Sequence, residues 1–245
     1  MTRRPTLITI PFSHYCEKAR WALDACHIAY EEDGHLPLFH YLAVRGRKSV
    51  PILVADRERL ADSTDIVRWA DGHAPGTLIP SEARARDEAL ALEDDFDRSL
   101  GPATRRWGYF HLLPRKDLQH VMVRGVPAWE ARALTVARPL AVRVLTRSLR
   151  IDEAGVERSR KKIEDAFATV EERLGDGRPY LVGDRFTIAD LTFAALASPI
   201  LFPREHPFGL PTPEELTPAA RTQVEAWRAR PAGQHAMTIY ARHRA

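Results

Sequence analysis

The N-terminal segment of this chain changes abruptly from a strand pattern to a helix pattern. Residues 7–10 are apolar and alternate like a strand, Pro11 ends the run, and apolar residues then recur at helical spacing from Cys16 to Leu23. Ser13 and Cys16 therefore lie where a strand ends and a helix begins. A helix N-terminus exposes free N–H groups and about half a positive charge, which favours anions and lowers the pKa of a thiol. The chain opens with a place suited to holding and activating sulfur.

Composition narrows the classes of function. The chain has 245 residues, 44% of them hydrophobic and 28% charged, with a formal net charge of +3, which suits one large or two ordinary globular domains. The basic runs at 45–48 and 158–162 are interpreted as solvated surface, so we expect no nucleic acid partner. Residues 191–202 form the most apolar stretch, but it is too short to span a membrane and contains Pro199, so no membrane association is expected. Two cysteines and no secretion signal favour a cytoplasmic protein without a disulfide scaffold.

The first third of the chain alternates strands with helices. Strands are predicted at 7–10, 28–32, 51–54 and 59–61, with helices at 16–27 and from 63 to about 70. This order is βαβ followed by ββα, which predicts a small open sheet with helices on its faces.

The remainder of the chain has helical periodicity. Residues 75–81 are interpreted as a linker between a domain at 1–74 and an all-helical domain at 82–245. Helices are predicted over about 82–100, 127–148, 153–174, 187–198 and 218–229, and the proline-rich residues 199–218 are predicted to form an ordered surface loop. Thr187 and Asp190 are spaced as a capping box at the start of a helix that is apolar nearly all round.

Three motifs, in this order, resemble the soluble glutathione S-transferase family. The first is Ser13-His14-Tyr15-Cys16, the second is Val50-Pro51 before a strand and then Asp62-Ser63, and the third is the capping box within 183–190. The resemblance covers essentially the whole chain. It implies an α/β domain of thioredoxin-like fold followed by an all-α, C-terminal helical bundle domain.

The resemblance gives Ser13 the role of presenting its hydroxyl to the sulfur of glutathione, so that the thiolate, which is the nucleophile, is stabilised. A simple helix cap is the alternative. Cys16 is the rival catalytic residue, because Ser-x-x-Cys is a Cys-x-x-Cys redox motif whose first thiol is replaced. Cys16 either forms a mixed disulfide with glutathione or packs in the core. His14 departs from the family, since many relatives have proline there.

The other glutathione contacts also come from the resemblance. Val50-Pro51 is predicted to be a cis peptide whose Val50 backbone pairs with the cysteinyl part of glutathione. Asp62 and Ser63 are predicted to hold the γ-glutamyl group, at a position where many relatives have Glu or Gln instead of Asp. Lys48 is predicted to reach the glycyl carboxylate. His40 and Arg47 are alternatives to Lys48.

The electrophile pocket is predicted to face Ser13 from the helical domain. Its proposed lining residues are Tyr15, Trp107, Tyr109, Phe110 and His111. Packing in the core is the alternative interpretation of the aromatic cluster at 107–111. The histidines and cysteines have no metal-ligand spacing, so no metal cofactor is expected.

The resemblance implies a glutathione S-transferase that conjugates the glutathione thiolate to an apolar electrophile, as in detoxification. Two alternatives remain open: a glutathione-dependent disulfide or peroxide reductase, and a non-catalytic glutathione-binding or regulatory module. The resemblance also implies a homodimer.

Overall fold

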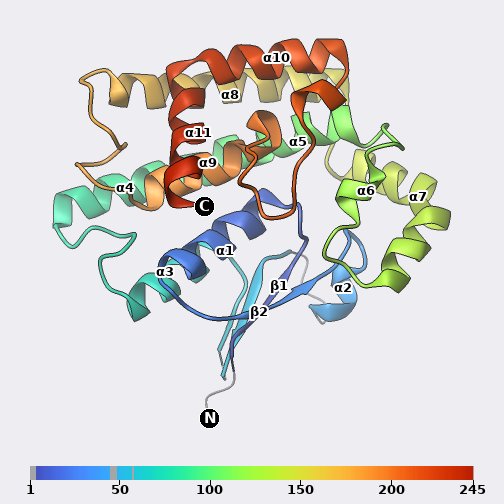
Figure 1. The fold of residues 1–245 in the computed structure, drawn as a ribbon, viewed down its shortest axis with the longest axis horizontal. Helices are drawn as coiled ribbons and strands as arrows, with labels where there is room; N and C mark the ends of the chain where they lie inside the picture. The colour runs from blue at the N-terminus through green and yellow to red at the C-terminus, as the bar shows by residue number, and fades with distance from the viewer. Residues whose placement is uncertain (1–3, 45–48, 57, 245) are drawn as a thin grey trace.

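A four-stranded sheet forms the N-terminal part of the molecule. The structure, a computed structural model, describes residues 4–44, 49–56 and 58–244. The sheet has the order β2-β1-β3-β4 (Figure 1). Strand β1 (Thr6–Thr9) runs parallel to β2 (Glu31–Gly34) and antiparallel to β3 (Ile52–Ala55), and β3 runs antiparallel to β4 (Glu58–Leu60).

The two faces of the sheet bury different side chains because neighbouring strand residues point to opposite faces. Leu7 and Leu53 contribute to the main core together with α1 (His14–Ala25) and α3 (Ser63–His73). Ile8 and Ile52 point the other way and pack with Val44, which follows the short helix α2 (His40–Ala43). The sheet is therefore covered on both faces.

The C-terminal part contains helices and loops, and no strand is found in its described residues. The first long helical run is α4 (Ala83–Asp95), a π-helical turn η1 (Phe96–Leu100) and α5 (Gly101–Leu112). The remaining helices follow in order: α6 (Gln119–Met122), α7 (Ala128–Ser148), α8 (Glu153–Leu174), α9 (Ile188–Leu201), the 3₁₀ turn η2 (Pro213–Glu215), α10 (Pro218–Ala229) and α11 (Pro231–His243). Helices α1 and α3 lie between the sheet and this helical layer (Figure 1).

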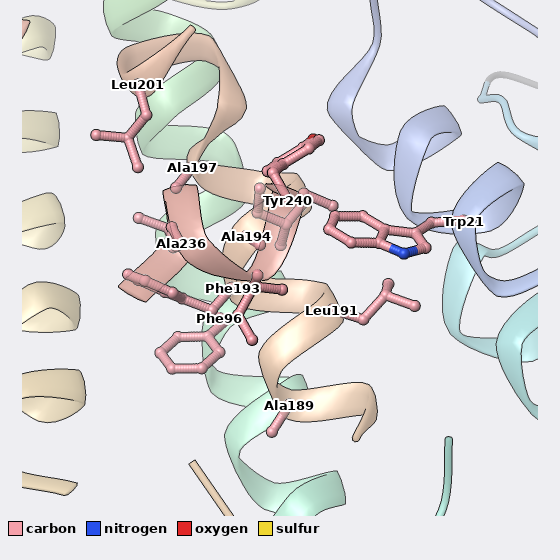
Figure 2. Packing of buried hydrophobic residues seen from close by; sticks show 14 of the residues in the cluster. Trp21, Phe96, Ala189, Leu191, Phe193, Ala194, Ala197, Leu201, Ala236 and Tyr240 are labelled. Atoms are coloured by element: carbon pink, nitrogen blue, oxygen red, sulfur yellow. The ribbon is translucent and has the colours of Figure 1, made fainter. Parts of the chain in front are cut away.

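Helix α9 runs through the centre of the core. Its side chains, among them Leu191 and Phe193, are buried on every side, and Trp21 of α1 packs on Tyr240 of α11 beside it, with ring centroids 4.6 Å apart (Figure 2). The main core thus continues from α1 into the helical layer without a break. Apolar burial of this extent is the dominant favourable term in folding.

The capping box at the start of α9 is confirmed. The Thr187 hydroxyl accepts a hydrogen bond from the Ala189 amide at 3.3 Å, and the Asp190 carboxylate accepts from the Thr187 amide at 3.1 Å. The fully buried Asp190 carboxylate also accepts from the Leu181 amide at 2.9 Å and lies 3.1 Å from Nε2 of His235. Buried α9 thereby starts with satisfied polar groups.

The architecture confirms the predicted thioredoxin-like sheet followed by an all-helical part. Within the described residues, no helix is both long and apolar enough to cross a membrane.

Candidate active site

The sheet topology brings the predicted glutathione-binding residues together at one end of the strands. Ile8 of β1 lies opposite Ile52 of β3 in an antiparallel pair, so the end of β1 that leads into Ser13 lies beside the start of β3, where Val50 is found. Because β4 runs antiparallel to β3, the chain returns to the same end of the strands, where α3 begins at Ser63.

Ser13 occupies the N-cap position of α1, but its hydroxyl does not cap the helix. Its backbone is extended, with φ −75° and ψ 125°, and its carbonyl accepts a hydrogen bond from the Glu17 amide at 2.8 Å. No side-chain capping bond is made. The half-buried Ser13 hydroxyl instead interacts with the thiol of Cys16 and lines an apolar cavity. The Ser13 hydroxyl can therefore contact a ligand in the cavity, and it does not have the role of a simple helix cap.

Cys16 lies one turn into α1 and faces the core. The side chain is fully buried, and its Sγ accepts a hydrogen bond from the Ile10 amide at 3.4 Å. Burial raises the pKa of the Cys16 thiol to about 11, although Arg20, the Ile10 amide and the Ser13 hydroxyl act in the opposite direction. A buried thiol that stays protonated is neither accessible nor nucleophilic. The core interpretation of Cys16 fits this placement, and the catalytic interpretation does not.

His14 joins the start of α1 to the helical layer. Its Nε2 donates a hydrogen bond to the Gly101 carbonyl at 2.9 Å, because a carbonyl can only accept. Burial and then the charge of Arg105 lower the pKa of His14 to about 3, so the ring is neutral at physiological pH. His14, at the position where many relatives have proline, thus links α1 to α5.

Asp62 and Ser63 lie at the start of α3. Asp62 is exposed, and its Oδ1 accepts a hydrogen bond from the Thr64 amide at 2.8 Å, which makes it the N-cap. The Ser63 side chain is buried and makes no hydrogen bond within the described part of the chain. The Ser63 hydroxyl and the α3 N-terminus therefore remain available to a ligand carboxylate.

The Val50-Pro51 peptide is cis, as predicted. Val50 is half-buried and Pro51 is buried. Lys48, predicted to bind the glycyl carboxylate, and its alternative Arg47 lie outside the residues that the structure describes. The other alternative, His40, is buried in α2.

An apolar cavity opens beside Ser13, between the start of α1 and the helical layer. Its walls come from Phe12, Ser13 and His14, from α5, from residues 118–122 and from the end of α9 with the loop that follows it. Tyr109 and Arg105 both line it from α5. The cavity has a volume of about 60 Å³, and its lining is mostly hydrocarbon with a few polar groups, a composition that small-molecule sites share.

Only Tyr109 of the five predicted pocket residues lines this cavity. Trp107 is buried in the core, and its Nε1 donates a hydrogen bond to Oε1 of Gln223 at 2.6 Å. His111 packs on the Trp107 ring with centroids 4.4 Å apart, and the Phe110 ring packs edge-on against His111.

Tyr15 also lies outside the cavity lining. Its hydroxyl donates a hydrogen bond to the Asp97 carbonyl at 2.9 Å, and burial raises its pKa. The prediction for Tyr15, Trp107, Phe110 and His111 is corrected for a physical reason: a helix presents only one face to a cavity, and these side chains are engaged elsewhere.

Most of the cavity lining was not predicted from the sequence, including Arg105, residues 118–122, the end of α9 and the loop that follows it. Arg105 is one helical turn before Tyr109 on the same face of α5, a signal that helical spacing could have given. The loop 202–212 contributes Phe202, Leu210 and Pro211. Its proline-rich sequence indicated a loop, but it gave no sign of which surface the loop would cover.

Sequence comparison places both parts of the chain in one family. Residues 7–78 match the glutathione S-transferase N-terminal domain, and residues 153–230 match the glutathione S-transferase C-terminal domain. The chain belongs to the glutathione S-transferase family.

Solved structures support the fold over nearly the whole length. A possible glutathione S-transferase from Rhodopseudomonas palustris has 17% identity and a TM-score of 0.59, covering 98% of this chain and 95% of its own. The β-etherase LigF from Sphingobium sp. strain SYK-6 has 18% identity and a TM-score of 0.60, with coverage of 96% and 99%. A glutathione S-transferase from Methylobacterium radiotolerans, solved with glutathione sulfonate, has 22% identity and a TM-score of 0.57, with coverage of 96% and 95%. No curated protein matches the chain by sequence.

Proposed function

We propose that this protein is a glutathione transferase that activates glutathione with Ser13 and conjugates it to an electrophile held in the apolar cavity. The observation that carries the proposal is the position of Ser13, whose uncapped hydroxyl lies at the N-terminus of α1 and lines that cavity. Free glutathione has a thiol pKa near 8.5 and is mostly protonated at neutral pH. A hydroxyl donor and the helix N-terminus both favour its thiolate.

Glutathione is proposed to bind at the end of the strands where Ser13, Val50 and Ser63 lie. The Val50 backbone, before cis-Pro51, pairs with the cysteinyl part in the manner of an added strand. The Ser63 hydroxyl and the first amides of α3 bind the γ-glutamyl carboxylate, and the exposed Asp62 carboxylate faces the γ-glutamyl ammonium. A glutathione sulfonate complex of a structural neighbour supports this choice of ligand by analogy.

The conjugation reaction then requires mainly that the glutathione thiolate and the electrophile are held close together in the right orientation. The glutathione sulfur attacks the electrophilic atom, a C–S bond forms, and the leaving group departs with its electron pair. Holding both reactants in one site lowers the entropic part of the barrier. We propose that the protein acts as a homodimer, as the family resemblance implies, and in the cytoplasm, as its two unpaired cysteines favour.

The reductase alternative is less well supported by the structure, because it needs a reactive thiol at Cys16. A non-catalytic module that has lost glutathione binding is less well supported, because the Asp62-Ser63 pair is intact at the start of α3.

Calorimetric titration with reduced glutathione at neutral pH tests the proposal. We expect a dissociation constant in the micromolar to low-millimolar range, weakened at least 10-fold by Ser63→Ala, which corresponds to about 1.4 kcal/mol. Ser81→Ala, an exposed serine in the linker, is the matched control and should bind as the wild type does. Absence of glutathione binding by the wild type would refute the proposal and favour the non-catalytic alternative.

A further inference from the structure

Three arginines surround a second cavity next to the apolar one. Arg105 and Arg106 of α5 and Arg150, which follows α7, line a space with a volume of about 300 Å³. The rest of its lining is Pro102, Ser148 and Leu149, so no carboxylate lies among the lining residues. Within the described residues, none of the three arginines forms an ion pair with a carboxylate.

The remaining charges near this cavity do not neutralise it. Arg106 donates hydrogen bonds to the Leu149 carbonyl at 3.1 Å and the Ser159 hydroxyl at 2.8 Å, which are both neutral acceptors. Asp152 is the acidic group that acts on Arg106: it raises the pKa of Arg106 but forms no ion pair with it, and its carboxylate accepts a hydrogen bond from the Gly155 amide at 2.6 Å. Burial lowers the pKa of Arg106, and the charges of Arg105, Arg158 and Arg150 lower it further. The site thus holds mutually repelling cations that an anion would relieve.

Arg105 belongs to both cavities. It lines the apolar cavity together with Ser13 and Tyr109, and it also lines the arginine cavity. The Arg105 side chain is half-buried, with its guanidinium carbon 5.9 Å from the centroid of the Tyr15 ring. A ligand that fills the apolar cavity beside Ser13 therefore meets a guanidinium without a carboxylate partner at its edge.

We propose that the natural electrophile is an amphipathic acid, with an apolar body in the cavity beside Ser13 and an oxyanion on Arg105. The carboxylate, sulfonate or phosphate of such a ligand can accept two parallel hydrogen bonds from one guanidinium. Arg106 and Arg150 add a positive field behind Arg105. The inference rests on the proposed transferase function for the reaction, but anion binding at Arg105 can be measured without turnover.

Binding of an unreactive pair of probes tests the arginine site. The pair is 3,5-dinitrobenzoate and 3,5-dinitrobenzamide, titrated calorimetrically in the presence of glutathione. We expect the benzoate to bind at least 10-fold more tightly than the amide, with an advantage that shrinks as salt concentration rises. Arg105→Met should bring the benzoate to the affinity of the amide. Equal affinities in the wild-type protein would overturn the inference.

Control variants separate charge from packing. Arg143→Met removes an exposed arginine of α7 and should leave both affinities unchanged. Arg105→Lys should retain part of the benzoate preference, and Arg150→Met, at an exposed residue, should reduce it about threefold. Loss of benzoate and amide binding in equal proportion in Arg105→Met and Arg105→Lys would show a packing role and overturn the inference.

Turnover of a reactive pair distinguishes this inference from the proposed function. With 4-chloro-3,5-dinitrobenzoate or its amide, a C–S bond forms at the ring carbon that bears chlorine, chloride leaves, and the thiol proton passes to solvent. We expect kcat/KM, divided by the uncatalysed rate, to be at least 10-fold higher for the benzoate. Turnover of the amide without this preference would overturn the acid-substrate inference alone. Benzoate-selective binding without turnover of either probe would refute the transferase proposal alone.

Discussion

Lys18 of α1 and Asp97 of the π-helical turn form a hydrogen-bonded ion pair, with Nζ 2.7 Å from Oδ1 although 79 residues separate them. The same ammonium group donates to Glu93 and, at 3.0 Å, to the Thr64 hydroxyl. The Thr64 hydroxyl donates in turn to Glu93 at 2.5 Å. Lys18 is fully buried. This network joins α1 and α3 of the sheet domain to α4 and its π-helical continuation.

Lys18→Met is expected to destabilise the protein by about 3–5 kcal/mol, because it leaves the buried Glu93 carboxylate and the half-buried Asp97 carboxylate without a cation. Chemical denaturation at pH 7 measures the change. Lys161→Met, at an exposed position of α8, should change the free energy of unfolding by less than about 0.5 kcal/mol. The double variant Lys18→Met, Glu93→Gln should recover part of the loss. A loss below about 1 kcal/mol in Lys18→Met would contradict the assigned network.

Glu17 predicts an acid-dependent loss of stability. Its buried carboxylate accepts hydrogen bonds from Arg20 at 2.8 Å and Arg244 at 2.6 Å, and lies 4.0 Å from Nε2 of His206. Burial acts to raise the pKa of Glu17, but His206, Arg20 and Arg244 outweigh burial and lower the pKa to about 2. His206 contributes only in acid, because burial lowers its own pKa to about 4, so at pH 7 Arg20 and Arg244 are the groups that stabilise the Glu17 charge. Since the folded-state pKa is depressed, the stabilisation is present above the unfolded-state value near 4.5 and is lost as pH falls toward 2.

Glu17→Gln should therefore lose on the order of 2 kcal/mol of stability at pH 7 relative to the wild type, because two charge-assisted hydrogen bonds are weakened, and the difference should shrink between pH 4.5 and the lowest pH at which the proteins fold. Denaturation curves at pH 7, 5, 4 and 3 measure it. Glu172→Gln, at an exposed position of α8, provides the control. A difference that does not change across this range would show that Glu17 contributes by packing instead of by charge.

Cys16 should not react in the folded protein. Because its thiol is buried with a pKa raised to about 11, iodoacetamide at pH 8 should label it only after unfolding. Mass spectrometry of native and denatured samples measures this difference, and Cys26, also buried, gives a comparison on the same chain. Rapid labelling of native Cys16, with loss of glutathione-dependent activity, would favour the reductase alternative.

The sequence predicted most elements because their signals are local. The periodicity of α7, α8 and α10 predicted their bounds to within one residue, since long amphipathic helices repeat their pattern over several turns. Strand β2 was predicted at 28–32 but lies at Glu31–Gly34. Its residues are mostly charged and carry no apolar alternation, and pairing with β1 selects them instead.

The backbone features that the proposed glutathione contacts use were predictable from the sequence, whereas most residues that line the cavity were not. The cis-Pro51 peptide and the α3 N-cap at Asp62 follow from short motifs. The cavity lining depends on which face of α5 meets the end of α9, a tertiary relationship that the aromatic cluster at 107–111 did not reveal. Arg105 lies in the cavity, whereas Trp107 lies in the core two residues later.

Ser13→Ala gives the sharpest test of the proposed chemistry. Removing one hydrogen-bond donor to a developing or bound anion costs about 100-fold or more in kcat, so we expect kcat/KM for glutathione to fall by about that factor at pH 7. The apparent pKa of the bound thiol, read from the pH dependence of kcat at saturating glutathione, should rise toward the free value near 8.5. Glutathione affinity should change little, because Ser63 and the Val50 backbone remain. Ser81→Ala again serves as the control. An unchanged pH profile in Ser13→Ala, with turnover intact, would remove Ser13 from the mechanism and leave the N-terminus of α1 as the group that stabilises the thiolate.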